Sequence, residues 1–260
     1  MHVTRLGAVD YLNARPLAGG LGPDFSVRFD VPSVCAKLLA SGDIDLGLIP
    51  TIAYADLPGA RAVPRVSIAS NGPVASVAIF SKRPVAEVRS LALDTSSRTS
   101  VALTRILSAR VFGISPSFVP HAPDLPAMLT TCDAALLIGD PALFAGDAAA
   151  GLEKIDLGQV WTDWTSLPFV WAFWAGRSGA ADARVVRCLQ EARDAGVAAS
   201  DRIADDYCAG DPARQALARR YLRENINYDL SERALAGLQR YFEEAAALGI
   251  VERVERVEFF

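Results

Sequence analysis

Two kinds of hydrophobic pattern alternate along the first part of the chain. Short and mainly apolar segments, which are typical of strands buried in a sheet, lie at 4–9, 45–49, 88–93 and 134–138. Between these runs, apolar residues recur every three or four positions and predict helices from Pro32 to Gly42, from about residue 101 to Gly113, and over 125–130. Strands that alternate with helices predict an α/β protein built on parallel sheets.

The region to residue 145 consists of two halves with similar organisation, and we expect one lobe for each half. A strand, a kink at Gly72-Pro73 and a second strand fill 66–80, which suits a crossover between two sheets because Gly-Pro interrupts a ladder. The apolar run at 168–175 is the expected return strand. These features predict a discontinuous lobe 1 at 1–73 and 177–260, and lobe 2 at 74–176.

Beyond residue 176 the pattern is mainly helical. Helical spacing of apolar residues covers 183–199, 200–208, 213–224 and 231–248. The remaining segment, 251–260, is predicted to be a closing strand.

Four loops follow the predicted strands, and they are the first candidates for a functional site. In α/β sheets, ligands bind beyond the carboxyl ends of the strands. The loops in question are 10–16, 50–51, 94–100 and 139–141.

The third of these loops is rich in hydroxyl groups. Residues 94–100 read Asp-Thr-Ser-Ser-Arg-Thr-Ser and connect a predicted strand to a predicted helix. The first amides of a helix have no internal partner and lie at the positive end of its dipole, so this turn is suited to binding an anion. The alternative interpretation is that these side chains only cap the start of the helix, where a single Ser or Thr would be enough.

Composition limits the class of protein. The net charge is −4 and the basic residues are scattered, which argues against a nucleic-acid partner. The N-terminus lacks a signal-peptide pattern and the most apolar run is too short to span a bilayer, so we expect a cytoplasmic protein with no membrane partner. Four widely spaced cysteines are interpreted as reduced thiols. For the four tryptophans within 161–174 we favour half-buried packing at the lobe junction, and the alternative is that they line the cleft.

The sequence contains neither a phosphate-cradling glycine loop nor a cluster with metal-ligand spacing. We therefore expect no cofactor and no metal. The oligomeric state, monomer or homodimer, is left open by the sequence.

Four strings occur in one order along the chain: YLNARPL at 11–17, TSSRTSV at 95–101, LIGD at 137–140 and WTDWTSLPFV at 161–170. Together they resemble the chorismate dehydratases of the futalosine route to menaquinone. The resemblance extends to about residue 176. It implies a two-lobed fold like the type II periplasmic binding proteins, with two mixed sheets joined by crossover strands and a ligand cleft between the lobes. It also implies a reaction in which chorismate loses water to give 3-[(1-carboxyvinyl)oxy]benzoate.

Asn13 is the candidate catalytic residue, because its amide can hydrogen-bond the departing hydroxyl or orient the substrate. The alternative is a turn residue that precedes Pro16. Substrate-binding candidates come from all the loops and from the crossover: Tyr11, Ser70, Gly72, Ser96, Ser97, Arg98, Thr99, Ser100, Ile138, Gly139 and Asp140. For two acidic residues we favour structural roles, with Asp94 bracing its own turn and Asp140 capping a helix that starts at Pro141.

The candidate loops contain no histidine, so protein bases are scarce there. This scarcity suggests the hypothesis that the enolpyruvyl carboxylate of the substrate itself accepts the C3 proton.

Two other functions share the expected fold. The first is a non-catalytic binding protein for a small carboxylate, which usually needs an export signal. The second is 1,4-dihydroxy-6-naphthoate synthase, a family with a Ser-Pro-Cys-Pro-Asn-type first loop and a histidine after the second-lobe strand. This chain has Tyr-Leu-Asn at 11–13 and a glycine at 139, which disfavours the second alternative.

Overall fold

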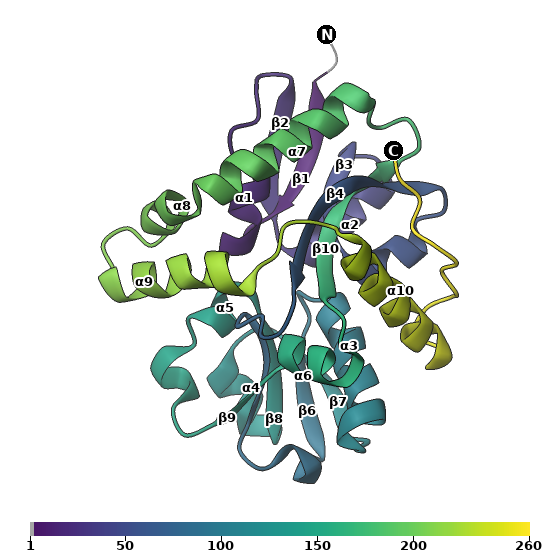
Figure 1. Cartoon of the computed structure of the whole chain (residues 1–260). Coiled ribbons are helices and arrows are strands. Elements are labelled where there is room, and N and C mark those ends of the chain that lie inside the picture. The colour runs from purple at the N-terminus through teal and green to yellow at the C-terminus, as the bar shows by residue number, and fades with distance from the viewer. Residues whose placement is uncertain (1–2) are drawn as a thin grey trace.

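The computed structural model describes residues 3–260 and shows two lobes, each built around a five-stranded mixed sheet (Figure 1). The sheet of lobe 1 has the order β2-β1-β3-β10-β4. Strands β2, β1 and β3 are parallel, whereas β10 is antiparallel to both of its neighbours. The strands are β1 (Thr4–Val9), β2 (Phe25–Asp30), β3 (Leu46–Pro50), β4 (Ala60–Ser70) and β10 (Phe169–Arg177).

The sheet of lobe 2 has the order β7-β6-β8-β5-β9. Its strands are β5 (Val77–Ser81), β6 (Ser90–Asp94), β7 (Ser117–His121), β8 (Ala134–Ile138) and β9 (Glu153–Asp156). Strands β7, β6 and β8 are parallel, and β5 is antiparallel to β8 and β9. The predicted buried strands are confirmed, and so are the two mixed sheets that the resemblance implied. Each sheet combines three parallel strands with a crossover strand, β10 in lobe 1 and β5 in lobe 2, that runs antiparallel to its neighbours.

Ten α-helices within residues 3–260 cover the sheets: α1 (Arg15–Ala18), α2 (Pro32–Ser41), α3 (Thr99–Leu107), α4 (Leu125–Thr131), α5 (Gly139–Leu143), α6 (Leu157–Thr165), α7 (Ala183–Ala198), α8 (Ser200–Tyr207), α9 (Pro212–Arg220) and α10 (Glu232–Ala247). Left-handed glycines end two of the predicted helices as expected, at Gly42 and at Gly113. Three short irregular helices lie at or beside the site: η1 (Leu12–Ala14), η2 (Thr51–Asp56) and η6 (Tyr221–Asn225). A fourth, η4 (Ser108–Phe112), continues α3 as far as Gly113. The predicted 10–16 loop is thus largely helical.

The two lobes are joined by the segment between β4 and β5 and by the segment between α6 and β10. Ala75 adopts a left-handed conformation with φ of 63°, and Asp156 holds the amides of Val74 and Ala75 at 3.0 and 2.6 Å. Because β10 pairs with β3 and β4, the chain re-enters lobe 1 before Phe169, not after residue 176 as predicted.

The C-terminal segment does not form the predicted strand. Residues 251–260 run mostly without regular structure, apart from one isolated bridge between Phe259 and Ala62. The Ala62 amide donates to Glu258 O at 2.8 Å, and the Phe260 amide donates to Ala62 O at 3.1 Å. Farther along β4, Ala69 exchanges backbone hydrogen bonds of 2.9 and 2.7 Å with Asn227.

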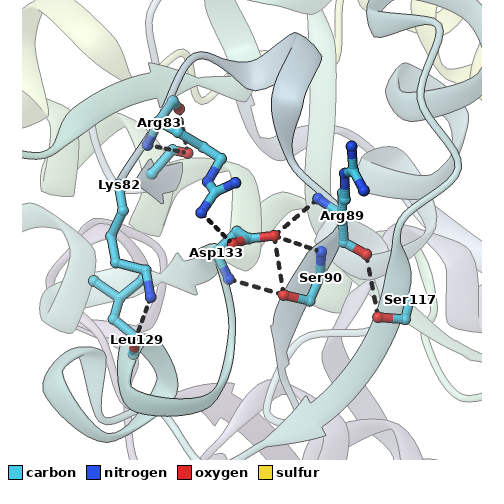
Figure 2. A network of polar contacts seen from close by, with 8 residues as sticks. Lys82, Arg83, Arg89, Ser90, Ser117, Leu129 and Asp133 are labelled. Atoms are coloured by element: carbon cyan, nitrogen blue, oxygen red, sulfur yellow. Dashed lines mark hydrogen bonds and ion pairs between the residues drawn. The ribbon is translucent and has the colours of Figure 1, made fainter.

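A polar network holds the far end of lobe 2 together, at the amino-terminal ends of β6 and β8 (Figure 2). Asp133 accepts hydrogen bonds from the amides of Arg89 and Ser90 at 3.0 and 3.1 Å, and forms an ion pair with Arg83 at 3.1 Å. These amide bonds lower the pKa of Asp133 below its ordinary value. The network lies opposite the carboxyl ends of these strands and therefore fixes the sheet without entering the site.

Aromatic packing links the lobes near the junction. The rings of Trp161 and Phe169 lie 5.1 Å apart, and Phe169 lies 4.9 Å from Tyr241. Trp161 is fully buried, whereas half-buried packing was expected of the junction tryptophans. All four cysteines are free. None of the helices in residues 3–260 is long and apolar enough to cross a membrane.

Candidate active site

A small cavity lies between the lobes, at the carboxyl ends of the central strands. Its volume is about 60 Å³, far below the roughly 300–1,000 Å³ of typical small-molecule sites. The lining residues are Val9, Tyr11, Asn13, Pro32, Pro50, Ile68, Val74, Ser76, Val77, Ser97, Thr99, Ser100, Ile138, Gly139, Trp171 and Ala172. The two lobes therefore lie close together at this cavity.

Asn13 lines the cavity from η1 and its side chain is held in place. Its Nδ2 donates to the hydroxyl of Tyr221 at 3.0 Å, and the hydroxyl of Tyr228 donates to its backbone oxygen at 2.9 Å. The side chain is therefore bonded to a distant helix and does not close a turn before Pro16. Both tyrosines come from the C-terminal region, and no local pattern near Asn13 indicated them.

The hydroxyl-rich turn is braced by Asp94, as predicted. The carboxylate accepts from the Ser96 amide at 2.8 Å, from the Ser96 hydroxyl at 2.6 Å and from the Ile138 amide at 3.3 Å. Burial nevertheless raises the pKa of Asp94, since the bonds offset only part of the desolvation. Ser96 also contacts the Tyr11 hydroxyl at 3.4 Å, so it contributes to the turn and to the lobe interface.

Helix α3 begins at this turn and presents hydroxyl groups to the cavity. The Ser97 hydroxyl accepts from the Ser100 amide at 3.2 Å, which satisfies one of the first amides of the helix. The Thr99 hydroxyl accepts from the Ile52 amide in lobe 1 at 3.2 Å. Ser97, Thr99 and Ser100 all line the cavity.

Arg98 occupies a different position from the one expected of a substrate-binding residue. Its guanidinium forms an ion pair with Asp56 at 2.5 Å, is 43% exposed, and is not part of the cavity lining. The backbone at the start of α3 directs this side chain away from its hydroxyl-bearing neighbours. A sequence with several polar residues in a row does not show which of them faces inward.

Asp140 is not the helix cap that we predicted. The N-cap of α5 is Ile138, while the Asp140 carboxylate accepts from the Leu12 amide at 3.1 Å and from the Tyr207 hydroxyl. Both partners belong to lobe 1, so this carboxylate connects the lobes. Burial raises its pKa, against the lowering effect of these hydrogen bonds.

Gly139 allows the lobes to approach closely. Its φ is +63°, and a Cβ built there would lie 2.7 Å from ring atoms of Tyr11. A glycine is required both by the backbone conformation and by the ring that packs against it.

The crossover residues Ser70 and Gly72 support the cavity from behind. Ser70 Oγ accepts from Trp171 Nε1 at 3.1 Å, and the Gly72 amide donates to Thr162 Oγ1 at 2.9 Å. The ring of Trp171 lines the cavity, so for this tryptophan the alternative of a cleft-lining residue holds over the favoured junction packing. Ser76, also missed, lines the cavity from the start of β5.

The cavity has an unusual charge distribution for a site expected to hold anions. In the described part of the chain, its lining includes no lysine, arginine, histidine or carboxylate. An anionic ligand would be held by hydroxyl and amide donors and by the start of α3. Within residues 3–260 no cluster of side chains suits a metal ion.

The sequence profile of a protein family described as menaquinone biosynthesis matches residues 4–247. The chain belongs to this family. This family member is also similar to the chorismate dehydratase of Thermus thermophilus. The two are 32% identical over 263 residues, which cover 94% of this chain and 95% of that protein.

Solved structures of other proteins have a similar fold to this menaquinone biosynthesis family member. Protein AF1704 from Archaeoglobus fulgidus has a TM-score of 0.77 at 19% identity, covering 95% of this chain and 98% of that one. The periplasmic aliphatic sulphonate binding protein SsuA from Escherichia coli has a TM-score of 0.65 at 19% identity, covering 98% and 96%. The periplasmic-binding-protein-like fold implied by the four strings is therefore confirmed.

Proposed function

We propose that this protein is a chorismate dehydratase, a lyase that removes water from chorismate to form 3-[(1-carboxyvinyl)oxy]benzoate in the futalosine route to menaquinone. The observation that carries the proposal is the interlobe cavity, where Asn13 from lobe 1 faces the hydroxyl-bearing start of α3 from lobe 2. The similarity to the Thermus thermophilus enzyme over nearly the whole chain supports the same conclusion.

The reaction requires few groups from the protein. The ring C3–H and C4–O bonds break, a C3–C4 double bond forms, and the proton and hydroxyl leave as water. Because the ring becomes aromatic, positioning and help with proton transfer are the main tasks of the enzyme. Ser97, Thr99 and Ser100 supply hydrogen-bond donors suited to one carboxylate of the substrate, and the Asn13 amide contacts the departing hydroxyl.

Among the described residues, no side chain that lines the cavity would serve as a strong base. This supports the hypothesis that the enolpyruvyl carboxylate of chorismate accepts the C3 proton while the protein fixes its approach. A substrate analogue without that carboxylate should not be dehydrated at a comparable rate, and normal turnover of the analogue would refute the hypothesis.

The test of the function is incubation of purified protein with chorismate, followed by mass spectrometry for a product that has lost one water. Asn13→Leu should abolish most turnover, whereas Asn71→Leu is the matched control, since Asn71 is exposed and lies outside the cavity. Binding of chorismate without any product would instead establish a non-catalytic binding protein.

We also propose a cytoplasmic location for this reaction. The four free cysteines support it, because oxidising compartments favour disulfides. Fractionation of cells that express the protein would test this location directly.

A further inference from the structure

Three polar side chains from distant parts of the chain meet at one wall of the cavity. The Asn13 amide nitrogen lies 3.0 Å from the hydroxyl of Tyr221, and that hydroxyl lies 2.7 Å from the hydroxyl of Ser76. Asn13 and Ser76 line the cavity. Tyr221, on η6, is 1% exposed and stands behind them, so it reaches a ligand only through its two neighbours.

The direction of each hydrogen bond follows from the chemistry of the groups. The Asn13 nitrogen is a donor only, so the Tyr221 oxygen accepts. Tyr221 then directs its single proton to Ser76, its other partner. Ser76 in turn keeps its own proton for a group in the cavity. Burial raises the pKa of Tyr221, so the phenol retains the proton that the chain requires.

We propose that Tyr221 is a positioning residue that orders a hydrogen-bond chain from Asn13 through Tyr221 to Ser76. The chain fixes the plane of the Asn13 amide, whose second N–H and carbonyl oxygen then have set directions. It also makes Ser76 a hydrogen-bond donor to the substrate. The catalytic role of this hydrogen-bond chain rests on the proposed dehydratase function. The hydrogen bonds themselves do not depend on that function.

The chain also depends on the arrangement of the lobes. Asn13 and Tyr221 belong to lobe 1, whereas Ser76 directly precedes β5 of lobe 2. The bond between Asn13 and Tyr221 therefore persists when the lobes separate, and the bond to Ser76 forms only on closure. Closure around the substrate would complete the donor set at the moment when water is excluded.

The kinetic test compares two conservative variants. Tyr221→Phe keeps the ring and removes only the hydroxyl, so we expect kcat to fall by about 10- to 100-fold through loss of orientation, with little change in the dissociation constant of the product. Tyr54→Phe is the matched control, because the buried Tyr54 hydroxyl bonds Ala60 O at 2.8 Å and the Glu258 amide at 3.0 Å, outside the cavity. Wild-type turnover by Tyr221→Phe would overturn the proposal.

A second pair of variants tests whether the chain acts as a unit. Ser76→Ala should lower kcat on its own, and the double variant Ser76→Ala/Tyr221→Phe should lose less than the product of the two single losses, because each change breaks the same chain. Losses that simply multiply would show two independent residues and would contradict the proposal.

A readout without catalysis separates this inference from the proposed function. The side-chain amide of Asn13 gives NMR signals that can be assigned by their loss in Asn13→Ala. In free protein, Tyr221→Phe should move these signals and Tyr54→Phe should not. If the wild type fails to dehydrate chorismate but the signals move, the function is refuted and the hydrogen-bond chain stands. If the signals do not move, the chain is refuted whatever the activity.

Discussion

Replacement of Gly139 by alanine tests how the lobes close. In the structure an added Cβ would lie 2.7 Å from the Tyr11 ring, about 0.7 Å short of the 3.4 Å at which ordinary contact begins. Gly139 belongs to lobe 2 and Tyr11 to lobe 1, so this overlap arises only when the lobes are closed. Overpacking of this kind costs about 1–3 kcal/mol, which corresponds to a loss of ligand affinity of about 5- to 150-fold.

A second effect of the same substitution must be separated from the first. Alanine at a φ of +63° is strained by roughly 1–2 kcal/mol, but this strain is present in open and closed forms alike. It therefore lowers the free energy of unfolding without changing affinity. Gly113→Ala isolates this term, because Gly113 has a φ of +65° and no heavy atom lies within 4 Å of its added Cβ.

The assay combines calorimetric titration with 3-[(1-carboxyvinyl)oxy]benzoate and urea unfolding of both variants. Both should lose similar stability, and only Gly139→Ala should bind the product more weakly. Equal affinities for Gly139→Ala and Gly113→Ala would refute the reasoning, since they would show that the ligand-bound form does not bring Tyr11 against residue 139.

Three further outcomes follow from the structure. X-ray scattering should give a smaller radius of gyration with product than without it, because the cavity of about 60 Å³ is too small to admit a ligand unless the lobes part; an unchanged radius with confirmed binding would contradict this. Ser97→Ala should weaken product binding by about 5- to 150-fold, whereas Arg98→Ala, outside the cavity, should leave it unchanged in the same titration. Burial raises the pKa of Asp140, so the folded state favours the protonated carboxyl, and the contribution of this group to the free energy of unfolding should fall as the pH rises through the raised pKa. Asp140→Asn should flatten this fall in urea unfolding measured as the pH is raised from acid, and an unchanged slope would count against the reasoning.

The sequence indicated the parts of the fold that have a strong local signal. The central strands β1, β3, β6 and β8 are nearly continuous apolar runs, and their carboxyl ends led directly to Tyr11, Asn13, the start of α3 and Gly139. The edge strands β2, β7 and β9 were missed, because their half-exposed residues form no apolar run.

The parts of the site that depend on distant contacts had no such signal. Tyr221 lies 208 positions from Asn13 and reaches it only because the C-terminal helices fold back on lobe 1. Ser76 and Trp171 lie next to the crossovers and line the cavity. There the hydrophobic pattern predicts a strand, but it does not show which side chains of the strand point toward the cavity. Asp140 looked like a helix cap, and its true partners, Leu12 and Tyr207, are visible only when both lobes are in place.

The covering of β4 has a consequence for association between molecules. An edge strand with free backbone groups is a template for strand addition by a second chain. Here residues 258–260 and Asn227 occupy backbone groups at the two ends of the β4 edge, and Arg65 between them adopts a left-handed conformation that bends the strand. A variant shortened before residue 258 would free the groups of Ala62 and acquire a surface prone to aggregation, so fusions and truncations at this terminus need to preserve that pairing.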